Sequence, residues 1–264
     1  MSKKKKSSFK EEPLKEKNKY SKTSKIFLAI GFMLFLLFGI VLGYLSDYYK
    51  ASDEALAALQ TTQTVEVSGE DPIIFRPEKQ PEDEIGIIFY PGGKVDEKAY
   101  APIMKQLAKE GYTVFVASVP FHLAVFDSNA AEGIIEDHPE IKEWYLAGHS
   151  LGGAMAAAYT NKTTQQIEGL ILLAAYSAND LSSQELPVII IYGSHDEVLD
   201  VEKLKENQKN LPLGAKEYVL EGGNHALFGN YGFQEGDGEA TISASEQQEE
   251  TVELIHSFIH ENNK

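Results

Sequence analysis

Short apolar runs and longer amphipathic segments alternate along most of the chain. Uninterrupted apolar runs of four to eight residues predict strands that are buried on both faces, at residues 85–90, 112–119, 144–147, 170–175 and 188–192. Apolar residues spaced three or four apart predict helices at residues 96–109, 127–137, 201–210 and 245–260, the last with Ser245 and Gln248 in capping-box spacing.

Two further patterns complete the predicted sheet. Residues 64–68 and 73–75 flank a Gly-Glu-Asp-Pro turn and predict a β-hairpin, and residues 216–220 predict a last strand. Strands that alternate with helices after an initial hairpin form a mostly parallel sheet with helices on both faces. The expected fold class is therefore α/β, in a domain that spans residues 64–264.

Residues 26–45 form the longest apolar run, with twenty uncharged residues. At about 1.5 Å per residue a helix of this length spans roughly 30 Å, the hydrocarbon thickness of a bilayer. A buried core helix is rarely apolar all round. A cleaved signal peptide is the other membrane interpretation, but no Ala-x-Ala-like site follows the run. We expect an uncleaved transmembrane signal anchor, joined to the domain by residues 46–63, which contain a short helix capped by Ser52.

Charge is distributed unevenly and predicts a topology. Residues 1–25 carry ten Lys and three Glu, a net charge of +7, and we expect a disordered tail that lies in the cytoplasm by the positive-inside rule. Because the whole chain carries −16, the part from Ser46 onward carries −23. A body this acidic does not attract nucleic acid. The expected protein is a single-pass protein of the cell membrane with its domain outside the cell.

The segment around Ser150 has the pattern of a nucleophile elbow. The strand at 144–147 runs into Gly148-His149-Ser150-Leu151-Gly152, and an Ala-rich helical segment, 153–158, follows at once. A serine at the apex of such a strand–turn–helix unit is exposed for attack, and the flanking glycines leave room for the tight turn. A serine that merely caps a helix gives the same five-residue match.

Two later strand ends supply the partners that such a serine needs. Asp196 follows the strand at 188–192, and His225 follows the strand at 216–220. Sites in open α/β sheets form at the carboxyl ends of strands, and Ser…Asp…His is the chain order of α/β-hydrolase triads. The predicted roles are nucleophile for Ser150, acid for Asp196 and base for His225.

Several residues compete for these roles. Asp180 follows the preceding strand, and Glu197 and Asp200 lie on the same loop as Asp196. His195 is expected to be a loop neighbour, and His149 to point elsewhere around the turn. Surface roles are expected for the remaining histidines outside the pocket: His138, His256 and His260.

Oxyanion stabilisation requires two preorganised N–H donors. The amide of Leu151, directly after the nucleophile, is the first. The second is expected from the loop after residues 85–90, with Gly93 preferred and Lys94 as the alternative. The residues expected to line a small pocket are Phe121, His122, Leu123, Val125, Phe126 and Tyr176.

With these residues assembled, the chain resembles the α/β-hydrolase superfamily, and most of all its compact bacterial group related to dienelactone hydrolases. The resemblance runs from about residue 64 to the C-terminus, on FYPGGKVD (89–96), AGHSLGGAMA (147–156), YGSHDEV (192–198) and GGNHALFGNYGFQEGDG (222–238). It implies the same triad. Dienelactone hydrolases proper have Cys as nucleophile, so their substrate does not transfer. Segment 228–238 is expected to form a wall of the site beside His225.

The sequence thus predicts a membrane-anchored serine hydrolase that acts on small ester or thioester substrates through an acyl-enzyme. It implies no metal or organic cofactor, and it leaves the oligomeric state open. An acyltransferase or a peptidase uses the same triad. A non-enzymatic anchored binding module on the same fold is the alternative from another class.

Overall fold

The structure is a computed structural model that describes residues 21–79, 81 and 84–263. Most of the tail expected at 1–25 therefore lies outside the described residues. The chain divides into two compact units, one up to Ser46 and one at Asp47–Lys264. The first unit contains α1 (Lys22–Ser46), an exposed apolar helix of 25 residues that is long enough to cross a bilayer. It begins four residues before the predicted span, so residues 22–25 are helical.

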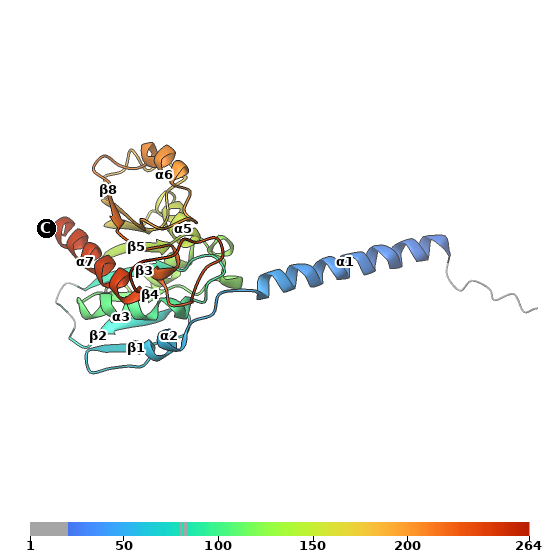
Figure 1. The fold of residues 1–264 in the computed structure, drawn as a ribbon, viewed down its shortest axis with the longest axis horizontal. Helices are drawn as coiled ribbons and strands as arrows, with labels where there is room; N and C mark the ends of the chain where they lie inside the picture. The colour runs from blue at the N-terminus through green and yellow to red at the C-terminus, as the bar shows by residue number, and fades with distance from the viewer. Residues whose placement is uncertain (1–20, 80, 82–83, 264) are drawn as a thin grey trace, which may run out of the picture. The chain divides into compact units, whose positions relative to one another are not determined.

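The second unit is built on one eight-stranded sheet with the order β1-β2-β4-β3-β5-β6-β7-β8 (Figure 1). The hairpin β1–β2 is antiparallel and β2 pairs antiparallel with β4, whereas all pairs from β4 to β8 are parallel. The strands are β1 (Val65–Ser68), β2 (Ile73–Pro77), β3 (Ile85–Tyr90), β4 (Thr113–Val116), β5 (Glu143–His149), β6 (Gly169–Leu173), β7 (Val188–Gly193) and β8 (Lys216–Leu220).

Helices cover both faces of the sheet, as the continuous apolar strands require. On one face α3 (Ala101–Lys109) and α7 (Ala244–Asn262) pack on alternate residues of the central strands, such as Phe89 and Tyr145. On the other face lie α4 (Ala130–Asp137), α5 (Leu151–Thr160) and α6 (Val201–Asn207), packed on the intervening residues, such as Ile88 and Leu146. α2 (Asp53–Ala58) lies at the β1 end of the sheet and α6 at the β8 end (Figure 1).

The strand order reverses direction between β3 and β5. After β3 the chain adds β4 on one side, and β5 then returns to pair with β3 on the other side. The loops that leave the carboxyl ends of β3 and β5 therefore diverge and leave a crevice, which is where ligands bind in open α/β sheets. The turn with Ser150 and the loop with Gly93 start at these two ends.

Several element ends differ from the sequence predictions. The helix predicted at 96–109 begins as a 3-10 turn, η1 (Glu97–Tyr100), and the one at 201–210 ends as another, η4 (Gln208–Asn210). The remaining 3-10 turns are η2 (Pro120–His122), η3 (Ala124–Phe126) and η5 (Ala226–Phe228). The capping box of α7 uses Ser243 and Glu246, so the prediction of Ser245 and Gln248 was wrong. Gln248 is instead buried and donates to the carbonyl of Leu227.

The stretch expected to be a linker is packed on the body. Ser52 caps α2 by accepting the amide of Ala55, as predicted. Ala55 is fully buried, and the amide of Ser52 donates to the carbonyl of Asn230. Upstream, Tyr49 forms a parallel bridge with Val95. These partners are distant in the sequence, which is why local composition gave no sign of them.

Candidate active site

Ser150 lies at the apex of a strained turn between β5 and α5. Its φ of 53° and ψ of −122° are unusual for a residue with a side chain, and strain of this kind is concentrated at functional sites. The turn also needs Gly152, because a Cβ there would lie 2.2 Å from the carbonyl oxygen of Tyr90 at the end of β3. The Gly-x-Ser-x-Gly pattern thus reflects the close approach of the turn to the neighbouring strand.

Asp196 and His225 form a buried pair on the loops after β7 and β8. His225 Nδ1 lies 2.8 Å from Asp196 Oδ2, and the two side chains are 1% and 0% exposed. The other oxygen of Asp196 accepts the amides of Val198 and Leu199 at 2.9 and 2.7 Å. Within the described residues His225 Nε2 has no hydrogen-bond partner. The pair therefore presents one ring nitrogen without a partner.

The competing residues are occupied elsewhere. Asp180 is exposed and accepts the hydroxyl and the amide of Ser182. Asp200 caps α6 and pairs with Lys203 in solvent. Glu197 is exposed, and His195 Nδ1 faces the carbonyl of Glu239. Among these four acids, Asp196 is the one whose carboxylate contacts a histidine in the described residues.

Ser150 and His225 open into the same cavity, with a volume of about 470 Å³. Its walls are mostly small or apolar, and Tyr176 lies among them as predicted. The other lining residues are Leu151, Ala154, Ala174, Ala175, Ala178, Val198, Leu199, Asp200 and Lys203. Four of the lining residues are therefore alanines, which leave room beside Ser150 and His225.

The structure does not bring Phe121, His122, Leu123, Val125 and Phe126 into this cavity, so that prediction was wrong. Phe121 and His122 both have left-handed backbone, with φ of 57° and 55°, and the carbonyl of His122 accepts the amide of Lys94. Phe121 and Phe126 pack edge to face and are each more than half exposed.

The loop after β3, residues 91–96, approaches the elbow at Gly93. A Cβ on Gly93 would lie 2.9 Å from Leu151 Cδ2, so the two backbones are close. The amide of Lys94, the alternative donor, is bonded to the carbonyl of His122 at 2.7 Å, and that of Gly92 to the hydroxyl of Tyr100 at 3.0 Å. In the part of the chain that the structure describes, no acceptor is found for the amides of Gly93 and Leu151.

His149 is part of the site, which the sequence did not indicate. It is buried, its ring lies 4.5 Å from that of His225, and its Nδ1 lies 2.9 Å from the Tyr100 hydroxyl. That hydroxyl accepts the Gly92 amide and can donate its own proton to His149. Burial, helped by the charge that His225 can carry, holds the pKa of His149 well below 6.5. His149 is therefore neutral and connects the β3 loop with His225.

Asp237 gives segment 228–238 a structural role. Its buried carboxylate accepts the amides of His225, Ala226 and Gly238 at 3.2, 2.9 and 2.9 Å. The amide of Glu197, beside Asp196, donates to it at 3.4 Å. One carboxylate thus joins the loops of the acid and the base. The segment was expected to form a wall of the site beside His225, and its local sequence gave no sign of these partners.

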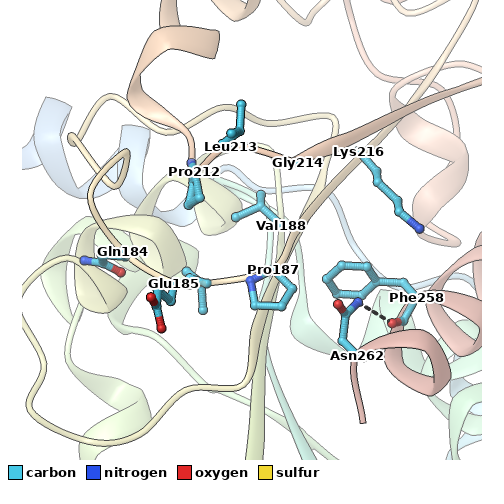
Figure 2. A pocket seen from close by; sticks show the side chains of 11 residues that line it. Gln184, Glu185, Pro187, Val188, Pro212, Leu213, Gly214, Lys216, Phe258 and Asn262 are labelled. Atoms are coloured by element: carbon cyan, nitrogen blue, oxygen red, sulfur yellow. Dashed lines mark hydrogen bonds between the residues drawn. The ribbon is translucent and has the colours of Figure 1, made fainter. Parts of the chain in front are cut away.

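A second cavity, of about 260 Å³, lies at the opposite ends of the strands. Figure 2 shows its lining by Pro187 and Val188 at the start of β7, Pro212 and Leu213 on the loop before β8, and Phe258 on α7. Its lining contains no serine or histidine. The cavity at Ser150 is therefore the better candidate for chemistry.

Comparisons with known proteins agree with this fold. Residues 86–249 match the sequence profile of the family described as Alpha/beta hydrolase family. No curated protein matches the chain. Similar solved structures include a predicted CIB-like hydrolase of Thermoplasma acidophilum (16% identity, TM-score 0.53, 73% of this chain and 99% of that one). Others are the esterase Est2 of Thermogutta terrifontis (16%, 0.53, 75% and 92%) and carboxylesterase CesB of Bacillus subtilis (13%, 0.54, 78% and 95%).

Proposed function

Because the chain belongs to the alpha/beta hydrolase family, we propose that it is a membrane-anchored serine hydrolase that cleaves small ester or thioester substrates. The observation that carries this proposal is the buried Asp196–His225 pair. His225 Nε2 has no partner in the described residues, and His225 lines the same cavity as Ser150. The esterases among the similar structures support an ester bond as the target.

In the proposed mechanism Ser150 Oγ attacks the substrate carbonyl carbon while His225 Nε2 takes the hydroxyl proton. Asp196 holds the imidazole in the tautomer that leaves Nε2 free and stabilises the imidazolium that forms. The amides of Gly93 and Leu151 donate to the developing oxyanion, and α5 adds the positive end of its dipole. His225 then protonates the leaving alcohol or thiol. Water, activated by the same imidazole, releases the acid from Ser150.

The size and lining of the cavity favour substrates with compact acyl groups. About 470 Å³ bounded by four alanines, Tyr176 and Leu199 holds a short apolar chain. One structure of the Thermogutta esterase holds butyrate and another propionate. For this chain we propose short acyl esters as the first substrates to test.

The proposed location is the cell membrane, with the N-terminus in the cytoplasm and the domain outside. Support comes from α1, which is apolar and exposed over 25 residues, and from the ten lysines that precede the apolar run.

A fluorophosphonate probe tests the proposed nucleophile. The full chain in detergent is expected to be labelled and to hydrolyse p-nitrophenyl butyrate, and Ser150→Ala to lose both. Labelling that persists in folded Ser150→Ala, or a folded wild type that neither reacts nor hydrolyses short esters, would contradict the proposal.

A matched pair of carboxylate variants tests the proposed acid. Asp196→Asn is expected to lower kcat by up to about 10⁴-fold, because the imidazole loses the partner that selects its tautomer. Asp180→Asn, at the exposed rival carboxylate after β6 that does not line the cavity, is expected to keep kcat within about twofold. Equal losses of kcat in the two variants would show that Asp196 has no special role.

A further inference from the structure

The peptide Asp47–Tyr49, which directly follows α1 in the sequence, is paired with the candidate oxyanion loop, residues 91–96. Tyr49 and Val95 form a parallel bridge. The amide of Tyr49 donates to the carbonyl of Lys94 at 2.7 Å, and the carbonyl of Tyr49 accepts the amide of Asp96 at 2.9 Å. The peptide thus extends along the loop as a short additional strand.

Side chains on both sides reinforce this pairing. The ring of Tyr48 stacks on that of His122 at 4.0 Å, and the carbonyl of His122 accepts the amide of Lys94. Lys94 Nζ lies 3.3 Å from Asp47. The hydroxyl of Tyr49 accepts the amide of Glu235 at 3.2 Å. The loop is therefore connected through Asp47–Tyr49 to two other segments of the body.

These contacts surround Gly93 and leave its amide without an acceptor among the described residues. Before Gly93, the amide of Gly92 is bonded to Tyr100. After it, Lys94 has a left-handed φ of 58°, which an L residue adopts only when its surroundings impose it. The contacts that impose it are those of Lys94 with His122 and Tyr49. An oxyanion donor must be fixed before the reaction begins, since reorganisation during the reaction raises the barrier.

We propose that Asp47–Tyr49 is a positioning segment for the oxyanion loop, and not a passive tether between the apolar helix and the body. The proposal rests on the proposed function, in which Gly93 donates to the oxyanion. Activity then depends on residues at the very start of the second unit. None of the three touches the substrate, so their effect is on the geometry of Gly93.

The main test removes one backbone donor in the full chain. Tyr49→Pro removes the N–H that donates to the carbonyl of Lys94. Because Tyr49→Pro also removes the side chain that accepts the Glu235 amide, Tyr49→Ala, which keeps the N–H, is measured beside it and is expected to retain more of kcat than Tyr49→Pro. The control is Lys50→Pro at the next residue, which is exposed and whose N–H has no acceptor among the described residues. With p-nitrophenyl butyrate, Tyr49→Pro is expected to lower kcat by about tenfold to a hundredfold. KM is expected to stay within about threefold, because the alanine-lined cavity is unchanged. Lys50→Pro is expected to keep both constants.

A second pair separates positioning from general loss of folding. Tyr48→Ala removes the ring stacked on His122 and is expected to lower kcat, while Tyr48→Phe keeps the ring and is expected to restore it. Hydrogen exchange of the amides at 94–96 should accelerate in Tyr49→Pro and Tyr48→Ala, with protection of β5 and β6 unchanged.

The outcomes distinguish this inference from the proposed function. An inactive wild type refutes the proposed function. If the wild type is active and Tyr49→Pro keeps its kcat, the positioning role is refuted, even where hydrogen exchange at residues 94–96 accelerates. A Tyr49→Pro variant that loses protection throughout the sheet also refutes it, because the segment then supports the fold as a whole.

Discussion

His149 adjoins the proposed nucleophile in the sequence and lies against the proposed base in space. Burial depresses its pKa in the folded protein, so the unfolded chain binds a proton at this histidine at a higher pH than the folded one does. The free energy of unfolding therefore falls as the pH drops below about 6.5, the ordinary value for histidine. The groups in contact with its ring are Tyr100, His225 and Phe228.

Replacing His149 should remove this pH dependence. His149→Asn keeps an oxygen that can accept from Tyr100 but has no titrating group. Between pH 7.5 and 5 the Tm of wild type is expected to fall more steeply than that of His149→Asn, and His260→Asn, at an exposed position on α7, should follow wild type. Parallel Tm curves for wild type and His149→Asn would show that His149 is not the acid-sensitive group.

At the scale of single residues, the sequence identified those whose position follows from the order of the strands. Asp196 and His225 stand at the carboxyl ends of neighbouring strands, and the structure brings them within 2.8 Å. His149 and Asp237 were not identified, because their roles depend on burial and on partners far along the chain. Tyr100 lies 49 residues from His149, and nothing in the local pattern links them.

At the scale of elements, the turn from β5 into α5 tolerates no side chain at Gly152. Gly152→Ala would place a Cβ 2.2 Å from a backbone oxygen of β3, and overpacking of this kind costs about 1–3 kcal/mol. Displacement of the elbow should also reduce kcat. Gly133→Ala on α4 meets no atom within 4 Å and should raise the free energy of unfolding by roughly 0.5–1 kcal/mol.

Urea unfolding and p-nitrophenyl butyrate hydrolysis by both alanine variants check this prediction. If the close approach of β3 and α5 causes the instability, Gly152→Ala lowers the free energy of unfolding while Gly133→Ala raises it. A Gly152→Ala protein as stable and active as Gly133→Ala would show that the contact with β3 relaxes freely.

The strands and most helices were predictable because their signal is local. Apolar runs located β3 to β7, and the Gly-Glu-Asp-Pro turn located the hairpin. The loop at residues 120–126 was not predictable in orientation, since its apolar residues fit a pocket wall as well as a surface. Two consecutive residues of this loop, Phe121 and His122, have left-handed backbone, which the apolar pattern of the loop did not indicate.

At the scale of the whole molecule, the absence of cysteine allows a clean test of the proposed topology. A single Cys placed at the fully exposed Leu213 should react with a membrane-impermeant maleimide on intact cells. A single Cys at Ser7, in the basic tail, should react only after lysis. The reverse pattern, or equal labelling of both before lysis, would refute the orientation with the domain outside.

The fold class and the strand-end logic of the site were accessible from sequence at this scale, because parallel sheets follow from alternation alone. The boundary between the tether and the domain was not accessible from the sequence. Residues 46–63 hold one short apolar run, 55–59, which predicted a helix in a linker, yet Ala55 is buried and Tyr49 is paired with Val95. Long-range pairing of this kind leaves no periodic trace in the segment itself.

The four alanines around the cavity at Ser150 have an evolutionary consequence. Ala154, Ala174, Ala175 and Ala178 lie on α5 and after β6, and none of them is among the residues proposed to attack, transfer protons or hold the imidazole. Enlarging any one of them shortens the space for an acyl chain and leaves the reacting groups in place. Divergence among descendants of this protein can therefore alter chain-length preference by single substitutions, while the hydrolytic chemistry is inherited intact.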